Sequence, residues 1–297
     1  MNSVFPRRRL LTAAVALLAS GCVSLSPSPA RAPDTPPVAV PAARPKIGLA
    51  LGGGAARGFA HIGAIKMLEA HGIVPDFVVG TSAGAVVGAL YAGGHDAFAM
   101  QKIAQQLDEK LFADWTLRGP GLLKGEALAD FVNLHLKGRP LEKLDKPFAA
   151  VATDLNSGER IVFRSGDSGL AVRASAAVPG IFQPARIRGH SYVDGGLTSP
   201  VPVQAAREMG ADIVIAIDIS ARPEGQPTDS MTAILWQTTT IMGGIIGRYE
   251  LAGADVLIRP KLPYVKSWDF AARNDAMLEG ERAALAALPA IKQKIAR

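Results

Sequence analysis

Residues 47–58 read IGLALGGGAARG, and residues 77–84 read FVVGTSAG. In each stretch a short apolar run leads into a glycine-rich turn, and an apolar segment with helical spacing follows. Strand, turn and helix, repeated along a chain, are typical of an α/β sheet whose functional loops lie at the carboxyl ends of the strands. The two stretches therefore predict an α/β fold with a mainly parallel central sheet.

The same patterns predict further elements. Helices are expected over residues 59–72 and 85–91. Further strands are expected over residues 148–153, 160–163, 191–193 and 213–217. Residues 232–251 are apolar at helical spacing, but Gln237, several threonines and Gly243-Gly244 make them a poor membrane span. A packed pair of helices is expected there instead.

The composition is that of an ordinary globular chain. Of 297 residues, 48% are hydrophobic and 20% are charged, which is enough to bury the core of one large domain. The formal net charge is +6, and the arginines at 7–9 supply half of it. The remaining charge is too weak to indicate nucleic-acid binding, although it favours adsorption to anionic lipid headgroups.

The N-terminal residues have the pattern of an export signal. The arginines at 7–9 precede an apolar run at 10–18 that is too short to span a bilayer, so residues 1–21 are expected to be a signal peptide. Cys22 follows three small residues and is the only cysteine, which excludes an intrachain disulfide or thiolate metal cluster. Residues 19–22 resemble the lipobox of bacterial lipoproteins, in which the cysteine is diacylglycerated.

This lipobox resemblance implies an exported protein that is anchored to a membrane through Cys22. Because Val23 rather than aspartate follows the cysteine, the periplasmic face of the outer membrane is favoured in a Gram-negative host. The arginine run also resembles a twin-arginine signal, so Sec and twin-arginine export both stay open. Residues 22–45, rich in Pro, Ala and Ser, are expected to be a tether between the anchor and a folded domain.

Residues 80–84 form a Gly-x-Ser-x-Gly pattern between a predicted strand and a predicted helix. In this setting a nucleophilic serine occupies a strained turn from which its hydroxyl projects, and Gly80 and Gly84 leave room for that turn. The alternative is a tight turn in which Ser82 caps the helix. The setting favours Ser82 as a nucleophile.

The glycine cluster Gly52-Gly53-Gly54 fits neither of two phosphate-binding patterns. Arg57 stands where a dinucleotide loop has its third glycine, and Gly58-Phe59 stands where a P-loop has Gly-Lys. The remaining interpretation is an oxyanion hole, in which backbone N–H groups at a helix N-terminus face a developing negative charge. Arg57 would support this loop or add positive potential to it, and a surface arginine is the alternative.

A serine hydrolase also needs a base for the serine proton. An α/β-hydrolase carries a late histidine, whereas each of the histidines here fits a structural role better: His61, His71, His95, His135 and His190. Residues 192–196 read YVDGG, which places Asp194 at a strand end, where Gly195 and Gly196 permit close approach to the serine. Asp154 is the rival base, but its Asp-Leu-Asn-Ser-Gly setting is more typical of a turn.

Three motifs in this order resemble the signatures of the patatin-like phospholipase family: residues 52–58, 80–84 and 194–196. Residues 153–158 and 174–184 also resemble blocks of bacterial members. The resemblance implies a three-layer α/β/α fold, a Ser82–Asp194 dyad, and an oxyanion hole from the backbone of the glycine cluster. It implies no metal and no cofactor, and hydrolysis of phospholipid or lysophospholipid acyl esters through an acyl-serine intermediate.

Domain boundaries and rival functions complete the predictions. The catalytic domain is expected over residues 46–220, with a C-terminal helical extension over 221–297 packed on it. Two other functions stay open: a small-ester or thioester hydrolase, and a lipid-binding regulatory module without turnover. Membrane lipids are expected as substrate and anchor, nucleic acid is not expected as a partner, and the oligomeric state stays undefined.

Overall fold

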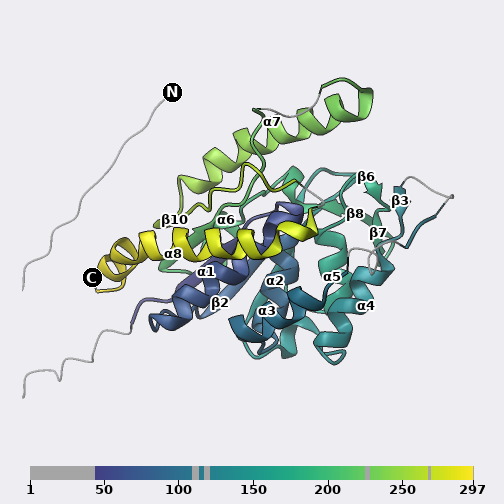
Figure 1. Ribbon diagram of the computed structural model, residues 1–297. Helices are drawn as coiled ribbons and strands as arrows, with labels where there is room; N and C mark the ends of the chain where they lie inside the picture. The colour runs from purple at the N-terminus through teal and green to yellow at the C-terminus, as the bar shows by residue number, and fades with distance from the viewer. Residues whose placement is uncertain (1–43, 109–113, 117–120, 225–227, 267–268, 297) are drawn as a thin grey trace, which may run out of the picture. The chain divides into compact units, whose positions relative to one another are not determined.

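The computed structural model describes residues 44–108, 114–116, 121–224, 228–266 and 269–296 (Figure 1). The predicted signal peptide, Cys22 and nearly all of the predicted tether lie outside the described residues. Among the described residues, no helix is both long and apolar enough to cross a membrane.

Eight described strands form the central sheet, in the order β10-β9-β1-β2-β4-β8-β7, with β5 also paired to β4. Their bounds are β1 Ile47–Leu51, β2 Phe77–Thr81, β4 Phe148–Asp154, β5 Arg160–Phe163, β7 Ala185–Ile187, β8 His190–Asp194, β9 Ile213–Ile217 and β10 Val256–Ile258. β10, β9, β1, β2 and β4 run parallel, and β5, β7 and β8 pair antiparallel. A small second sheet pairs β3 (Gly121–Leu123) with β6 (Gly180–Phe182).

Helices cover both faces of the central sheet. Their bounds are α1 Phe59–Ala70, α2 Ala83–Ala92, α3 Ala97–Gln106, α4 Glu126–His135, α5 Ser168–Ser175, α6 Val203–Glu208, α7 Met231–Leu251 and α8 Arg273–Ile295. Strand side chains alternate between two cores: Leu49 packs in the core that holds α1, α2 and α8, and Ala50 packs in the core that holds α6. The layers are therefore α/β/α, and the predicted mainly parallel sheet is confirmed.

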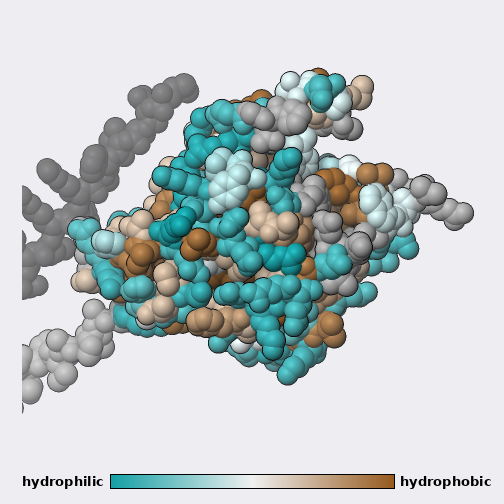
Figure 2. Space-filling model, in the orientation of Figure 1, coloured by the Kyte–Doolittle hydropathy of each residue, from teal (hydrophilic) through white to brown (hydrophobic). Residues whose placement is uncertain are grey.

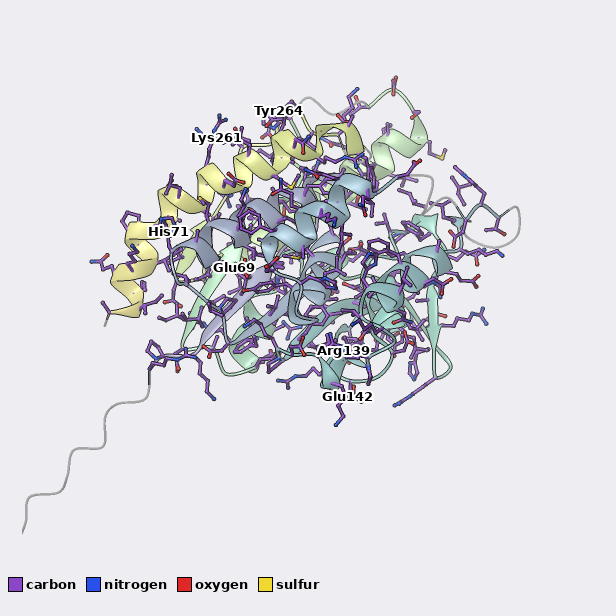
Figure 3. All side chains as sticks on the ribbon, turned by 60° about the horizontal axis from the view of Figure 1, so that its bottom comes forward. Glu69, His71, Arg139, Glu142, Lys261 and Tyr264 are labelled. Carbon is purple, nitrogen blue, oxygen red and sulfur yellow. The ribbon has the colours of Figure 1, made fainter. Side chains whose placement is uncertain are left out.

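Helix α8 lies along α1, as both Figures 1 and 3 show. The two backbones approach closely at glycines: a Cβ atom at Gly63 would lie 1.8 Å from the Met277 carbonyl oxygen, and one at Gly280 would lie 2.0 Å from that of Ala60. Lys66 Nζ also donates to Glu281 Oε1 at 2.8 Å. The last helix is thus part of the main core.

The C-terminal residues differ from the sequence prediction in two ways. Residues 221–297 contribute a strand, β10, to the central sheet as well as helices, because Val256 and Ile258 pair with β9. The predicted helix pair over 232–251 is wrong: α7 is one continuous helix through Gly243-Gly244. One face of this helix packs on the protein, through Gly247 and the hydrogen bonds of Glu250, while many of its large apolar side chains face solvent.

Candidate active site

Strand register brings Ser82 next to Asp194. On one edge of β4, β2 pairs as far as Thr81 opposite Val151, and β8 continues the same edge with Asp194 opposite Ala152. These two strands share an edge because β5 occupies the opposite edge of β4 across the same stretch. The residue that follows β2 and the last residue of β8 therefore meet.

Ser82 occupies a strained elbow between β2 and α2. Its backbone has φ 55° and ψ −120°, a conformation that favours glycine, and its side chain makes no capping hydrogen bond to α2. The helix-cap alternative for this serine is therefore wrong. Ser175 links the elbow to β4: Ser82 N donates to Ser175 Oγ at 2.9 Å, and Ser175 Oγ donates to the Val151 carbonyl at 2.6 Å.

The predicted elbow and dyad-loop glycines lie where backbones touch. A Cβ atom at Gly80 would lie 2.3 Å from the Gly84 carbonyl oxygen, and one at Gly84 would lie 2.2 Å from that of Leu51. At Gly195 it would lie 2.1 Å from the Val151 carbonyl oxygen. Side chains at these positions would push apart the strands that carry Ser82 and Asp194.

Asp194 is a buried carboxyl in which only one of the two oxygens accepts a hydrogen bond from a described residue. Its Oδ1 accepts from Gly196 N at 2.7 Å, whereas its Oδ2 has no hydrogen-bond partner of ordinary geometry among the described residues. Burial raises the pKa of Asp194 to about 6, against the lowering effect of the Ser82 hydroxyl and the Gly196 N–H. The Ser82 hydroxyl therefore lies close enough to affect the pKa of Asp194, but it does not make a hydrogen bond of ordinary geometry with the carboxyl. Catalytic hydrogen bonds of this kind often become well aligned only when substrate binds.

Asp154, the rival base, is fully engaged. Its Oδ1 accepts from Asn156 N at 2.9 Å and Ser157 N at 3.0 Å, and its Oδ2 lies 3.1 Å from His190 Nδ1. The hydrogen bonds from Ser157 and Asn156 hold the pKa of Asp154 below its ordinary value. The predicted turn is confirmed, and it leaves this carboxylate no free oxygen to act as a base.

The histidines make local contacts. His61, fully buried on α1, places Nε2 2.8 Å from the Gly52 carbonyl oxygen, and burial lowers its pKa to about 4. It is therefore neutral at pH 7 and donates to the glycine loop. His71, His95 and His135 each place a ring nitrogen 2.8–3.1 Å from a backbone carbonyl oxygen.

Two of the three predicted oxyanion-hole amides are already engaged. Gly52 N donates to the Ile217 carbonyl at 3.0 Å, and Gly53 N donates to the Pro200 carbonyl at 2.9 Å. The expectation that all three glycine amides face an oxyanion is therefore wrong. No described residue accepts a hydrogen bond from Gly54 N or from Ala83 N, the first amide of α2 after the elbow.

Arg57, which follows the glycine cluster, is anchored by hydrogen bonds to two backbone carbonyls. Its side chain is buried, and it donates through Nε to the Ile219 carbonyl at 2.9 Å and through a terminal nitrogen to the Val265 carbonyl at 3.4 Å. Burial lowers its pKa, while Asp218 acts in the opposite direction. Of the interpretations left open for Arg57, loop support agrees with these contacts, and its guanidinium is directed at carbonyl oxygens.

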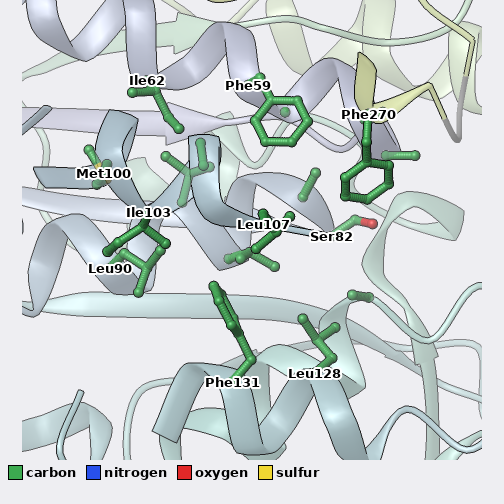
Figure 4. A pocket seen from close by; sticks show the side chains of 18 of the residues that line it. Phe59, Ile62, Ser82, Leu90, Met100, Ile103, Leu107, Leu128, Phe131 and Phe270 are labelled. Carbon is green, nitrogen blue, oxygen red and sulfur yellow. The ribbon is translucent and has the colours of Figure 1, made fainter. Parts of the chain in front are cut away.

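An apolar pocket begins at Ser82. It has a volume of about 150 Å³, and Figure 4 shows Ser82 at one end and Met100, Ile103 and Leu90 toward the other. Its other large lining side chains include Phe59, Ile62, Leu107, Leu128, Phe131 and Phe270. The hydroxyl of Ser82 is the polar side-chain group of this lining.

Sequence reasoning missed Ser175 and Glu250. Ser175 stands in the segment 174–184, but no periodicity indicates that its hydroxyl supports the elbow. Glu250, on α7, accepts from Ser199 Oγ at 2.6 Å and from Val201 N at 3.2 Å, beside the Pro200 carbonyl that holds Gly53. Burial raises the pKa of Glu250 to about 7. Both contacts join segments far apart in sequence.

A strained serine, a neighbouring buried carboxyl and free amides at a helix N-terminus are the geometric parts of a serine acyl-transfer site. The chain belongs to the patatin-like phospholipase family, whose pattern it matches over residues 49–207. It is 36% identical over 189 residues to an uncharacterized NTE family protein of Mycobacterium tuberculosis, across 63% of this chain and 52% of that protein.

Human patatin-like phospholipase domain-containing protein 6 is 34% identical over 186 residues, across 60% of this chain and 14% of its own length. The chain therefore matches about half of the mycobacterial relative and a small part of the human one. VipD from Legionella pneumophila has a similar fold, with a TM-score of 0.55 at 15% identity across 83% of this chain and 67% of that one.

Proposed function

We propose that the protein is a lipid acyl hydrolase in which Ser82 is the nucleophile and Asp194 its base. The observation that carries this proposal is the apolar pocket that ends at the Ser82 hydroxyl (Figure 4). A small or polar ester would leave such a lining without contacts, whereas a fatty acyl chain would fill it with its ester carbonyl at the serine. Phospholipids and lysophospholipids are the proposed substrates.

The reaction proceeds in two halves. Ser82 Oγ attacks the ester carbonyl carbon while its proton passes to Asp194, and the resulting oxyanion accepts hydrogen bonds from Gly54 N and Ala83 N. Collapse of the intermediate breaks the bond to the alcohol, which leaves with the proton from Asp194. Water then attacks the acyl-serine, gives its proton to Asp194, and releases the fatty acid and Ser82 Oγ, which recovers the proton.

The pKa of about 6 suits Asp194 to this role. At pH 7 the carboxyl is mostly ionised and can accept a proton, yet it is more basic than an ordinary aspartate because it is buried. Its Oδ2, which no described residue engages, is the oxygen available to the serine proton.

The experiment is to incubate the full chain with a panel of phospholipids and lysophospholipids and identify released fatty acids by mass spectrometry. Ser82→Ala should abolish both release and labelling by a fluorophosphonate probe, because it removes only the nucleophilic oxygen. Ser165→Ala, at an exposed serine, is the matched control and should keep both. Labelling that persists in Ser82→Ala, or turnover of short esters alone, would contradict the proposal.

The N-terminal prediction extends this proposal to location. An exported chain acylated at Cys22 would keep the site at a membrane surface, because several buried acyl chains anchor far more firmly than one. Wild-type chain grown with an alkyne fatty acid should take up label, and Cys22→Ser should not. Unlabelled wild type, or labelled Cys22→Ser, would show that the lipobox interpretation is wrong.

A further inference from the structure

Helix α7 exposes apolar side chains on the face turned away from the sheet. They recur at three- and four-residue spacing, so they form one stripe along the helix. This α7 stripe consists of side chains that are 43–80% exposed: Met231, Ile234, Leu235, Ile241, Met242, Ile245 and Tyr249. A surface helix ordinarily turns such a stripe toward the core, so the orientation of α7 is inverted.

The inward face of α7 holds the helix against the candidate active site. A Cβ atom at Gly243 would lie 3.9 Å from the Gly196 carbonyl oxygen, and one at Gly247 would lie 3.5 Å from Pro200 Cγ. Glu250 adds its two hydrogen bonds to Ser199 and Val201. Turning the α7 stripe inward would break these contacts, so the stripe faces outward beside the loop that follows Asp194.

Three threonines on α7 donate their hydroxyl hydrogen bonds within the helix, and the Gln237 amide donates to the Pro223 carbonyl at 2.8 Å. Thr238 and Thr239 donate to the Ile234 and Trp236 carbonyls, both at 2.8 Å, and Thr240 donates to the Trp236 carbonyl at 3.0 Å. No charged residue occurs from 231 to 247. Because unsatisfied polar groups and charges are what make transfer from water costly, this face can enter an apolar medium at low cost.

The charges near the stripe favour one kind of partner. Arg248 is exposed next to Tyr249 at one end of the stripe, where Glu250 is turned inward and hydrogen-bonded, and Asp229 is exposed before Met231 at the other end. An apolar stripe that ends in tyrosine and arginine complements acyl chains below a layer of lipid phosphates.

Other elements also expose apolar side chains. Leu197, in the loop after Asp194, is partly exposed, and Trp115 and Leu122 are exposed at β3. Figure 2 shows apolar side chains at the surface in the part of the view where Figure 1 labels β3 and β6.

We propose that the α7 stripe docks on the surface of a lipid bilayer, with the helix lying along the membrane and its inward face on the protein. Docking would hold the Ser82 pocket at the surface from which an acyl chain is drawn. This role is separate from the anchor at Cys22, and its lipid-hydrolysis part rests on the proposed function.

A probe on the helix tests the contact directly. Because Cys22 is the only cysteine, Cys22→Ser removes both the anchor and the thiol, and Met242→Cys then carries one environment-sensitive fluorophore. Vesicles of phosphatidylethanolamine and phosphatidylglycerol should shift its emission to the blue. The same label at Leu134→Cys, exposed on α4, is the control and should not shift. No shift at 242, or equal shifts at both positions, would overturn the proposal.

Substitution tests the energetic contribution of the stripe. Ile241→Gln/Met242→Gln/Ile245→Gln in the Cys22→Ser chain should weaken vesicle binding by at least about tenfold. Phe98→Gln/Leu134→Gln/Leu285→Gln removes three exposed apolar side chains from other helices and should not weaken it. Circular dichroism checks that both triple variants fold. Unchanged vesicle binding in the α7 variant would overturn the proposal.

The readouts separate this proposal from the proposed function. The α7 variant should hydrolyse vesicle lipid more slowly but hydrolyse p-nitrophenyl butyrate at the wild-type rate, and Ser82→Ala should bind vesicles like the parent chain. Vesicle binding without any hydrolysis would support docking and contradict the proposed function. If the α7 variant instead converts a dimer to a monomer and keeps vesicle binding, the stripe is a contact between copies and docking is refuted.

Discussion

Asp154 and Asp194 end two strands that pair with each other, and both side chains are buried, yet they differ in hydrogen bonding and in the direction of their pKa shifts. Asp154 has both oxygens engaged, and its pKa lies below the ordinary value. Asp194 has one oxygen without a partner in the described part of the chain, and burial raises its pKa to about 6. Residue type alone therefore does not separate a structural carboxylate from a candidate base: hydrogen bonds lower the pKa of Asp154, whereas burial raises that of Asp194.

The largest expected effect comes from exchanging each aspartate for asparagine. Asp194→Asn should lower turnover by about 10²-fold or more, because it removes the proposed proton acceptor while keeping the shape. It should leave the melting temperature at pH 8 unchanged or higher, since the buried charge disappears. Asp154→Asn should show the reverse: near-normal turnover and a lower melting temperature, because the turn loses its charged acceptor.

Initial rates on a soluble ester and thermal melts of both variants measure this crossed pattern. The comparison breaks if Asp154→Asn loses activity as Asp194→Asn does, or if neither variant does.

Two buried serines on α5 offer a second matched pair. Ser175 Oγ bridges Ser82 N and the Val151 carbonyl, whereas Ser168 Oγ donates to the Arg139 carbonyl at 2.7 Å, at the other end of the helix. Ser175→Ala should slow fluorophosphonate labelling by about tenfold, since it leaves the amide of the elbow without its acceptor.

Ser168→Ala also removes a buried hydroxyl and should destabilise the fold without slowing the labelling of Ser82. Equal labelling rates in the two alanine variants would show that Ser175 has only a structural role.

The pH dependence of activity should follow Asp194. Because only the ionised carboxyl accepts a proton, kcat/KM on a soluble ester should rise with pH through about 6 and be about tenfold below its plateau at pH 5. His61 cannot supply this limb, since its pKa is lowered to about 4. His190→Gln should keep the limb, and a profile that loses it in that variant would point to a histidine base.

The contribution of Asp194 to the free energy of unfolding should fall as pH rises, whereas activity should rise. Its folded pKa of about 6 exceeds its ordinary 3.8, so its contribution is complete below 3.8 and is lost as pH rises through 6. The full contribution to the free energy of unfolding is on the order of 3 kcal/mol. Denaturation of wild type and Asp194→Asn across this range should show the difference disappear at low pH. A constant difference would mean that burial does not set this pKa.

Glu250 is a third carboxyl that can be compared with Asp154 and Asp194. Like Asp154 it has both oxygens hydrogen-bonded, yet its pKa is raised to about 7 because burial outweighs the bonds from Ser199 and Val201. Its contribution to stability should therefore be lost between pH 4.5 and 7, by at most about 3 kcal/mol. The difference between wild type and Glu250→Gln in denaturation at several pH values measures it. A flat difference would mean that hydrogen bonding controls this carboxyl as well.

The sequence determined much of the fold because its strands and glycine turns are local patterns. Residues 47–51 and 213–217 form β1 and β9 as predicted, and residues 80–84 hold the predicted junction, with Ser82 between the end of β2 and the start of α2. Residues 231–251 were predicted less well: apolar spacing indicates a helix, but not which way its apolar face turns. That direction depends on contacts such as Gly243 with Gly196, which periodicity does not contain.

By itself, the sequence determined an α/β chain with a serine elbow and a strand-end aspartate, because residue type and spacing specify turns locally. The sequence preferred Asp194 to Asp154 as the base, but the reason that Asp194 lies beside Ser82 is tertiary, since strand register determines which residues share an edge of β4. The tertiary structure also places the Ile217 and Pro200 carbonyl oxygens where they accept hydrogen bonds from Gly52 N and Gly53 N. Hydrogen bonds between segments some 150 residues apart depend on how the strands assemble, and no local pattern records that.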